Sequence, residues 1–160
     1  MKKRILALLT ENARLNNKEL AAALGADECE IAALVGEMES EGIIKGYRTV
    51  LDYEKLEEDT VSAIIELKVT PEADYGFEDV AKHISQFSEV ESVYLMSGAC
   101  DIIVVVKGKS FREVATFVAE QLAVMEAVTG TATQFIMRRY KEFFTPLYGE
   151  EDDGRAKVSL

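Results

Sequence analysis

The second half of the chain alternates between strand-type and helix-type apolar periods, and their order restricts the fold more than any other feature. Residues 61–69 (VSAIIELKV) place an apolar side chain at every second position, as a strand with one buried face does. Residues 77–87 then repeat apolar side chains every three or four positions, which indicates a helix. Two strands follow on either side of Ser97–Cys100, and Ser110 with Glu113 forms a capping box that opens a second helix.

A last alternating strand is predicted in TGTATQFIMRRYKEFF (129–144), which completes the order strand, helix, strand, strand, helix, strand. This is the order of the α+β ferredoxin-like fold, in which two helices cover one face of an antiparallel sheet. Ile64, Tyr94 and Met96, or their neighbours, fall on the face that the helices leave uncovered. A sheet face this apolar needs a partner, and a second copy of the chain is the simplest one. The sequence therefore predicts a homodimer.

Residues 1–50 carry the pattern of a small helical unit. An apolar stretch at 5–9 indicates one helix, and NNKELAAALG (16–25) indicates a second helix that an Asn caps and Gly25 closes. Asp27 caps a third helix, in which apolar residues follow the i, i+3, i+4, i+7 rule. The short turn between the second and third helices is typical of a helix-turn-helix motif, although the spacing alone fits any small three-helix bundle.

The third helix is acidic for a helix that would enter a groove of DNA. Six carboxylates lie between Asp27 and Glu41, with no Lys or Arg among them. Phosphate neutralisation dominates DNA affinity, and bases are read mainly by Arg, Lys, Asn and Gln, so this helix by itself is a poor reader of bases. Two interpretations stay open: the helix is a solvated face, or it lies near DNA while residues elsewhere supply the contacts. On the second interpretation, the residues predicted to bind DNA are Arg14, Asn17, Lys18, Lys45 and Arg48.

The formal net charge of −11 is unevenly distributed. Residues 1–50 hold seven basic and eight acidic residues, a balance of −1, whereas residues 51–160 hold eleven and twenty-one, a balance of −10. We therefore expect a near-neutral helix-turn-helix unit at 1–50, a polar linker at 51–60, a ferredoxin-like unit at 61–145 and a mobile acidic tail at 146–160. The acidic balance argues against non-specific affinity for nucleic acid or anionic membranes.

Several classes of function find no support in the residues. Cys29 and Cys100 are isolated thiols and His83 is the single histidine, so neither a disulfide framework nor a zinc site is predicted. No apolar run reaches the roughly 20 residues of a transmembrane helix, and the first residues do not form a signal peptide. No nucleophile–base pair or pair of carboxylates is spaced for catalysis. We expect a cytoplasmic protein that is not an enzyme and has no cofactor, metal or membrane partner.

Three stretches carry a family resemblance: ILALLTENARLNNKELAAALG, GIIKGYRTVLDYEKL and SGACD. They are similar to the opening, the strand or wing with its linker, and a loop of the C-terminal domain in Lrp/AsnC transcriptional regulators, over about residues 2–145. The resemblance implies a DNA-binding winged helix-turn-helix followed by a RAM domain, the domain that regulates amino-acid metabolism, which forms dimers and often octamers. This chain departs from the family on the third helix. Where the family commonly has Arg or Lys, the residues are Ala32, Ala33, Leu34, Gly36 and Glu37.

The resemblance also implies a site for a small effector, typically an amino acid, near a loop with the pattern Gly-x-aromatic-Asp. Gly98 and Asp101 match this pattern, and Cys100 replaces the aromatic residue. Ser97 and backbone N–H groups are suited to hold a carboxylate, and Asp101 to accept from an ammonium group. The alternative is a hairpin turn in which Asp101 only ties the loop backbone. The residues predicted to bind the effector are Ser97, Gly98, Ala99, Cys100, Asp101, Thr131 and Thr133.

The sequence thus supports two functions of different classes. The first is an Lrp/AsnC-like transcriptional regulator, an oligomer that senses a small metabolite and binds DNA. The second is an effector-binding or assembly module whose acidic helix-turn-helix no longer binds DNA.

Overall fold

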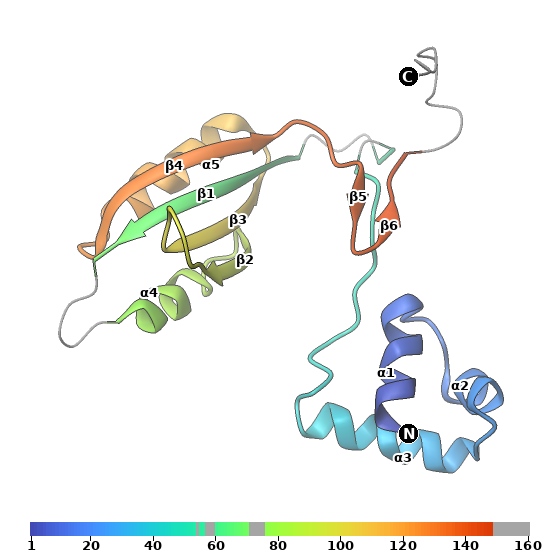
Figure 1. Cartoon of the computed structure of the whole chain (residues 1–160). Coiled ribbons are helices and arrows are strands. Elements are labelled where there is room, and N and C mark those ends of the chain that lie inside the picture. The colour runs from blue at the N-terminus through green and yellow to red at the C-terminus, as the bar shows by residue number, and fades with distance from the viewer. Residues whose placement is uncertain (54, 57–59, 71–75, 149–160) are drawn as a thin grey trace, which may run out of the picture. The chain divides into compact units, whose positions relative to one another are not determined.

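The computed structural model describes residues 1–53, 55–56, 60–70 and 76–148, and the chain divides into two compact units (Figure 1). The N-terminal unit is Met1–Leu51, and the remaining residues belong to the C-terminal unit. Part of the predicted linker and most of the predicted acidic tail lie outside the described residues.

Three helices form the N-terminal unit: α1 (Lys2–Glu11), α2 (Asn17–Leu24) and α3 (Glu28–Ser40). Asn16 forms a capping box at the start of α2, and Gly25 ends this helix in the left-handed conformation with a φ of 64°. All three helices contribute to one apolar core, whose buried members are Ile5, Leu9, Leu20, Ala21, Ile31 and Met38. The predicted helix-turn-helix architecture is therefore confirmed.

Residues 43–50, for which the resemblance implied a strand or wing and a linker, contain neither helix nor strand. The described part of the N-terminal unit holds no strand with which they could pair. Instead, the backbone N–H groups of Ile43 and Ile44 donate to the carbonyl oxygen of Met38, at 2.9 and 3.0 Å. These two bonds satisfy a carbonyl in the last turn of α3, which would otherwise lack an intrahelical partner.

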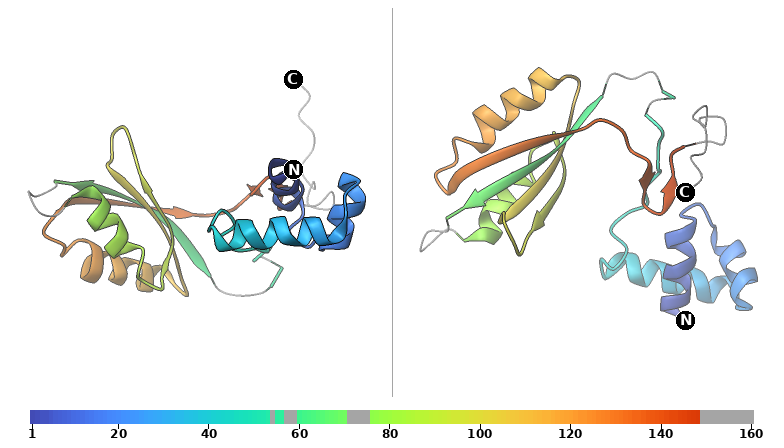
Figure 2. Two further views of the ribbon diagram at one scale, coloured as in Figure 1. Left: turned by 90° about the horizontal axis from the view of Figure 1, so that it is seen from below. Right: turned by 45° about the horizontal axis from the view of Figure 1, so that its top comes forward.

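The C-terminal unit has the predicted order of strands and helices. Its elements are β1 (Val61–Val69), α4 (Phe77–Ile84), β2 (Val90–Leu95), β3 (Ile102–Gly108), α5 (Phe111–Phe117), which continues as the π-helix η1 (Val118–Leu122), and β4 (Val128–Ile136). The strands form one antiparallel sheet in the order β2-β3-β1-β4. Both helices lie on the same side of this sheet, below it in the left view of Figure 2. The predicted ferredoxin-like fold is confirmed.

The helix-covered side of the sheet holds the core of this unit. Leu67 of β1 lies opposite Ile102 of β3, and Ile65 lies opposite Val104, and all four side chains are fully buried. The helix residues that complete the core are Val80, Ile84, Val114, Phe117, Val118 and Leu122. This one-sided burial fixes the strand register, because a slip of one residue would turn the core residues to the uncovered face.

The uncovered face carries the residues that the alternation predicted. Ile64 of β1 lies opposite Val105, and Tyr94 of β2 lies opposite Ile103, in the rows between the core rows. The side chain of Tyr94 is 53% exposed. Met96, the third residue expected on this face, lies just beyond the last residue of β2. The uncovered face is therefore apolar at the centre of the sheet.

The prediction of one strand over residues 129–144 is wrong in its length. β4 ends at Ile136, which pairs with Ser62 next to the first residue of β1, so the chain beyond it has no neighbouring strand in this sheet. The following residues form a separate hairpin of β5 (Lys141–Glu142) and β6 (Thr145–Pro146). The alternating pattern in the sequence continues beyond Ile136, where β1 no longer offers residues with which β4 could pair.

Ion pairs connect this hairpin to the sheet. The guanidinium group of Arg139 lies 3.6 Å from the carboxylate of Glu91 on β2 and 3.8 Å from that of Glu142 on β5. All three side chains are less than one-quarter exposed. The segment after β4 therefore reaches from one edge strand of the sheet to the other.

Candidate functional site

Small uncharged residues occupy the side of α3 that faces away from the core. Ile31 and Met38 are fully buried between the helices and define the inner side. The exposed residues on the opposite side follow the helical spacing i, i+4, i+7, i+11, and we call them the outward line: Cys29, Ala33, Gly36 and Ser40. The carboxylates of α3 lie on its two flanks, with Glu30, Glu37 and Glu41 on one side and Glu28 and Glu39 on the other. The outward line itself carries no charge.

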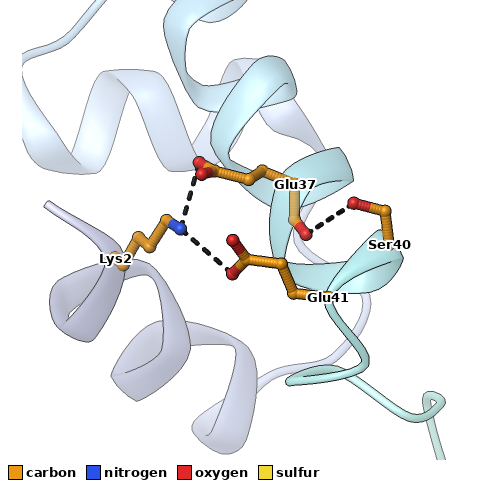
Figure 3. Close-up of polar contacts among 4 residues, drawn as sticks. All are labelled: Lys2, Glu37, Ser40 and Glu41. Atoms are coloured by element: carbon orange, nitrogen blue, oxygen red, sulfur yellow. Dashed lines mark hydrogen bonds and ion pairs between the residues drawn. The ribbon is translucent and has the colours of Figure 1, made fainter.

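One flank is paired with a lysine from α1 (Figure 3). The Nζ of Lys2 lies 3.0 Å from Oε2 of Glu37 and 3.3 Å from Oε2 of Glu41. The hydrogen bond to Glu37 raises the pKa of Lys2, and the bond to Glu41 and the charges of both carboxylates act in the same direction against a lowering by desolvation. Lys2 therefore neutralises part of the charge that made α3 look unsuited to DNA.

The other flank is paired with a tyrosine that follows α3. The hydroxyl of Tyr47 donates to Oε1 of Glu39 at 2.8 Å. Partial burial raises the pKa of Tyr47, and the hydrogen bond to Glu39 and the charge of that carboxylate raise it further. The segment of residues 43–50 therefore contacts α3 through Tyr47 even though it forms no strand.

The first turn of α3 holds its remaining acidic groups in positions that a helix favours. The side chain of Asp27 accepts from the backbone N–H groups of Cys29 and Glu30, at 2.8 and 3.3 Å. Glu28 and Glu30 are exposed near the positive end of the helix dipole, where negative charge is stabilising. Asp27, Glu28 and Glu30 thus stabilise the start of α3, and this role does not depend on any ligand.

The predicted DNA-binding residues lie on two stretches of the N-terminal unit. Arg14 is exposed between α1 and α2, where its backbone N–H donates to Oδ1 of Asn12 at 3.0 Å, and Asn17 and Lys18 begin α2. Lys45 and Arg48 are exposed in the segment after α3. None of these side chains belongs to α3 itself.

Lys2 makes ion pairs with α3 that were not predicted. It lies 39 positions from Glu41, and no periodicity or motif relates residues that far apart. Only the packing of α1 against α3 brings the three charged groups together. The sequence signal was limited to a lysine in the first turn of α1 and carboxylates late in α3.

The predicted effector loop joins β2 to β3, and Asp101 ties it to β1. Oδ2 of Asp101 accepts from the backbone N–H of Val69 at 2.9 Å. The N–H of Asp101 donates to the carbonyl of Leu67 at 3.0 Å, and its own carbonyl accepts from the N–H of Met96 at 2.8 Å. These three bonds fit the turn interpretation of Asp101, and an ammonium group would have to bind Oδ1 or share Oδ2.

The other predicted effector residues lie at the same end of the sheet. Ser97, Gly98 and Ala99 are exposed, and Cys100 is half-buried. Gly98 has a φ of 155°, which side chains with a Cβ rarely adopt.

Of the two β4 threonines predicted to bind the effector, Thr131 is the nearer to this loop. It lies opposite Leu67, the residue to which Asp101 is bonded. Thr133 lies opposite Ile65, one core row further from the loop. The structure thus brings the loop and Thr131 to one sheet end, with Thr133 further along β4.

Two polar contacts interrupt the apolar uncovered face. Nε2 of Gln134 on β4 donates to Oε1 of Glu66 on β1 at 2.8 Å. The Nζ of Lys107 on β3 lies 3.8 Å from the ring centroid of Tyr53, which makes a cation–π contact. Glu66 shares a row with Ile103 and Tyr94, and Gln134 shares a row with Ile64 and Val105, so one polar side chain lies beside the apolar residues in each of these rows.

Among the described residues, no group of three or more His, Cys, Asp or Glu side chains is placed to hold a metal ion. Cys29 is an exposed thiol and Cys100 a half-buried one. Within the same residues, every helix is too short or too polar to span a bilayer.

Two family models match the chain, one for each unit. Residues 1–45 match a winged helix-turn-helix DNA-binding model, and residues 62–146 match the Lrp/AsnC ligand binding domain. The second match alone covers more than half of the chain.

Relatives and solved structures agree with these matches. The chain is 38% identical to the uncharacterized HTH-type transcriptional regulator YugG of Bacillus subtilis (strain 168), over 97% of this chain and 94% of the relative. It is 30% identical to the HTH-type transcriptional regulator LrpA of Pyrococcus abyssi, over 86% and 94%. The transcriptional regulator NMB0573 of Neisseria meningitidis, solved as a complex with L-Met, has the same fold, with a TM-score of 0.71 and 23% identity over 88% of this chain and 90% of that one.

The three-helix unit and the ferredoxin-like unit each match their own family model, and the relatives are transcriptional regulators and not enzymes. This chain belongs to the Lrp/AsnC family of transcriptional regulators and combines a DNA-binding helix-turn-helix with a ligand-binding domain.

Proposed function

We propose that the chain is a homo-oligomeric regulator that binds DNA through its N-terminal unit and senses an amino acid through its C-terminal unit. The observation that carries the proposal is the uncharged outward line of α3, with the paired carboxylates Glu37, Glu39 and Glu41 on its flanks. An acidic helix of this kind presents small side chains and backbone, rather than carboxylates, to a groove. It therefore removes much of the objection that net charge raised against DNA.

Residues outside α3 are proposed to supply the phosphate contacts. Arg14, Lys18, Lys45 and Arg48 are exposed, and Asn17 is placed at the start of α2. Such contacts position a protein on DNA without reading its sequence. A single unit with so few cations binds weakly, and an oligomer multiplies weak contacts through effective concentration.

The loop between β2 and β3 is the proposed effector site. Ser97 and Gly98 lie exposed in the loop. The hydrogen bonds of Asp101 hold this loop at the end of the sheet where Thr131 also lies. Exposed backbone and a hydroxyl suit a carboxylate, and Asp101 suits an ammonium group, so an α-amino acid fits this chemistry. The L-Met complex of the Neisseria meningitidis regulator, which has the same fold, supports this choice of ligand class. Cys100 leaves more room in the loop than an aromatic residue would.

The uncovered sheet face is the proposed dimer surface. Ile64, Ile103 and Val105 form its apolar centre, with the half-exposed Tyr94 beside them. Contact of two such faces would bury apolar area that a monomer leaves in water. An effector that binds one arrangement of subunits more tightly than another would then change DNA binding, which is the thermodynamic content of allostery here.

DNA binding is tested by selecting duplexes from a randomised library with the full-length protein and measuring fluorescence anisotropy over a salt series. The variant Arg14→Gln/Lys18→Gln is expected to weaken binding and to lower the salt slope by about 1 for each phosphate that it no longer neutralises. Lys82→Gln is the matched control, because Lys82 is an exposed lysine on α4. If the wild type enriches no duplex even at low salt, the chain is an assembly or effector-binding module instead.

Effector binding is tested separately by calorimetric titration of each proteinogenic amino acid. Binding of at least one of them is expected, with loss of binding when Ser97 and Thr131 are both replaced by Val. Replacing Thr129, which also lies on β4 and is bonded to the Lys68 carbonyl, by Val is the control. Failure of every amino acid to bind would remove the sensing part of the proposal and leave the DNA-binding part standing.

A further inference from the structure

The carboxylates on the flanks of α3 would repel DNA phosphates unless a positive charge screens them. Glu37 follows Gly36 directly and stands four positions after Ala33, so it borders the outward line. Glu41 stands one position beyond Ser40, the last member of that line. A helix that approaches DNA with its outward line brings both carboxylates close to the phosphates on either side of the groove, where like charges repel.

The C-terminal end of α3 also lacks a cation of its own. A helix end of this kind carries partial negative charge, and basic residues are stabilising there. No basic residue lies in the last turn of α3, which instead holds Glu37, Glu39 and the cap residue Glu41. The dipole and the side chains therefore place negative charge on the same end of the helix.

Lys2 supplies the missing cation from another helix. Its ammonium group lies between the two carboxylates, 3.0 Å from Glu37 and 3.3 Å from Glu41, as the dashed lines in Figure 3 show. The side chain of Lys2 is 35% exposed, and those of Glu37 and Glu41 are 49% and 47% exposed. Ion pairs this accessible add little to folding stability, so their effect on the charge of the surface is the larger consequence.

We propose that Lys2 is a positioning residue for DNA binding. It holds the carboxylates of Glu37 and Glu41 beside the first turn of α1 and screens their charge, so that α3 can approach DNA. The inference rests on the proposed use of α3 as the helix nearest to DNA. Lys2 acts through the two carboxylates and does not itself contact a phosphate. An intramolecular counter-ion thus takes the place of the basic residues that α3 lacks.

The test is an affinity measurement on four full-length proteins: the wild type, Lys2→Met, Lys2→Met/Glu37→Gln/Glu41→Gln and Lys2→Arg. The probe is the tightest duplex that the wild type selects from the randomised library. Lys2→Met keeps the apolar stem and exposes two unscreened carboxylates, so its affinity is expected to fall roughly tenfold at low salt and less at high salt. Lys2→Arg keeps the cation and is expected to stay near the wild type.

The triple variant separates this mechanism from a direct phosphate contact. It has no cation at position 2, but it also has no carboxylates to screen, so its affinity is expected to return to the wild-type value. A purely structural role for Lys2 is checked by thermal unfolding, in which Lys2→Met should differ little from the wild type. Lys82→Met is the matched control for loss of an exposed, paired lysine, because Lys82 lies 3.6 Å from Glu78 on α4.

Two results would overturn the inference. A triple variant that binds as weakly as Lys2→Met would mean that Lys2 contacts the phosphates directly, with a salt slope lowered by about 1. Equal affinity of Lys2→Met and the wild type would mean that the carboxylates of Glu37 and Glu41 do not come close enough to the phosphates to repel them. If the wild type selects no duplex at all, the proposed DNA-binding function fails and this inference fails with it, a result distinct from the other two.

Discussion

The carboxylate of Asp101 accepts a hydrogen bond from the backbone N–H of Val69, although the two residues lie 32 positions apart in the chain. This bond joins the loop after β2 to the end of β1. The turn interpretation and the effector interpretation of the loop both assign a role to the Asp101 side chain. Replacing this residue therefore distinguishes them.

Replacing Asp101 separates the two roles. Asp101→Ala leaves the part-buried N–H of Val69 without its acceptor, and we expect a loss of about 1–3 kcal/mol in the free energy of unfolding. Asp101→Asn keeps a carbonyl oxygen that can accept from Val69, so its stability should lie close to that of the wild type. Urea denaturation measures both values.

The same Asn variant decides whether Asp101 also binds an ammonium group. Loss of amino-acid binding at nearly unchanged stability would assign the charge of Asp101 to the ligand. Retained binding in Asp101→Asn would leave Asp101 as a turn residue only and would move the ammonium site elsewhere.

Two glycines are expected to respond in opposite directions to the same substitution. A Cβ on Gly36 would meet no atom within 4 Å, and this residue lies inside α3, so Gly36→Ala should stabilise the N-terminal unit by about 0.5–1 kcal/mol. Gly98 also has open space around it, but its φ of 155° strains any L side chain. Gly98→Ala should therefore destabilise the C-terminal unit, by about 1 kcal/mol or more.

Thermal unfolding followed by circular dichroism measures both changes, and each variant serves as the control for the other. A Gly36→Ala protein that is less stable than the wild type would show that something outside the described contacts occupies the space next to Gly36. Such a result would count against the open outward line of α3.

The local parts of this fold were predictable because their signals lie within a few residues. The caps at Asn16 and Asp27 and the left-handed Gly25 are read from adjacent positions. The alternation in β1 likewise identified the buried face before any partner strand was known. Each of these elements is specified by its own residues, and the order of elements then leaves few possible folds.

The parts that failed depend on residues far apart in the chain. The end of β4 is set by the first residues of β1, which pair with Ile136, and the alternating residues after it gave no sign of this limit. The pairing of Lys2 with Glu37 and Glu41 depends on how α1 packs against α3. For this reason the sequence alone reveals the carboxylates of α3 but not that Lys2 screens two of them.

High pH is expected to weaken the N-terminal unit slightly, through two groups. The pKa of Lys2 is raised by Glu37 and Glu41, and the pKa of Tyr47 is raised by burial and Glu39. Both groups hold their proton more tightly in the folded state than in the unfolded state. Their stabilisation is therefore complete below the unfolded pKa values, near 10, and is lost as the pH rises through the folded values.

Urea denaturation between pH 8 and 11 tests this direction. The wild type should lose stability above about pH 10, and a Lys2→Met/Tyr47→Phe variant should lose less over the same interval, because it lacks both groups. Lys3→Met is the control, since Lys3 is an exposed neighbour on α1. Identical pH profiles for the double variant and the wild type would show that these two contacts add nothing measurable to stability.

The uncovered sheet face predicts how the oligomer can be broken without unfolding the subunit. Tyr94 is 53% exposed in the single chain, so Tyr94→Glu removes little packing from the monomer but places a carboxylate beside the apolar centre of the proposed dimer surface. We expect light scattering to show a dimer or larger assembly for the wild type and a subunit of half the dimer mass for Tyr94→Glu. Val124→Glu is the matched control, because Val124 is 66% exposed and follows η1 on the helix layer. If Val124→Glu dissociates the assembly and Tyr94→Glu does not, the subunits associate through the helices, and the apolar sheet face must have another partner.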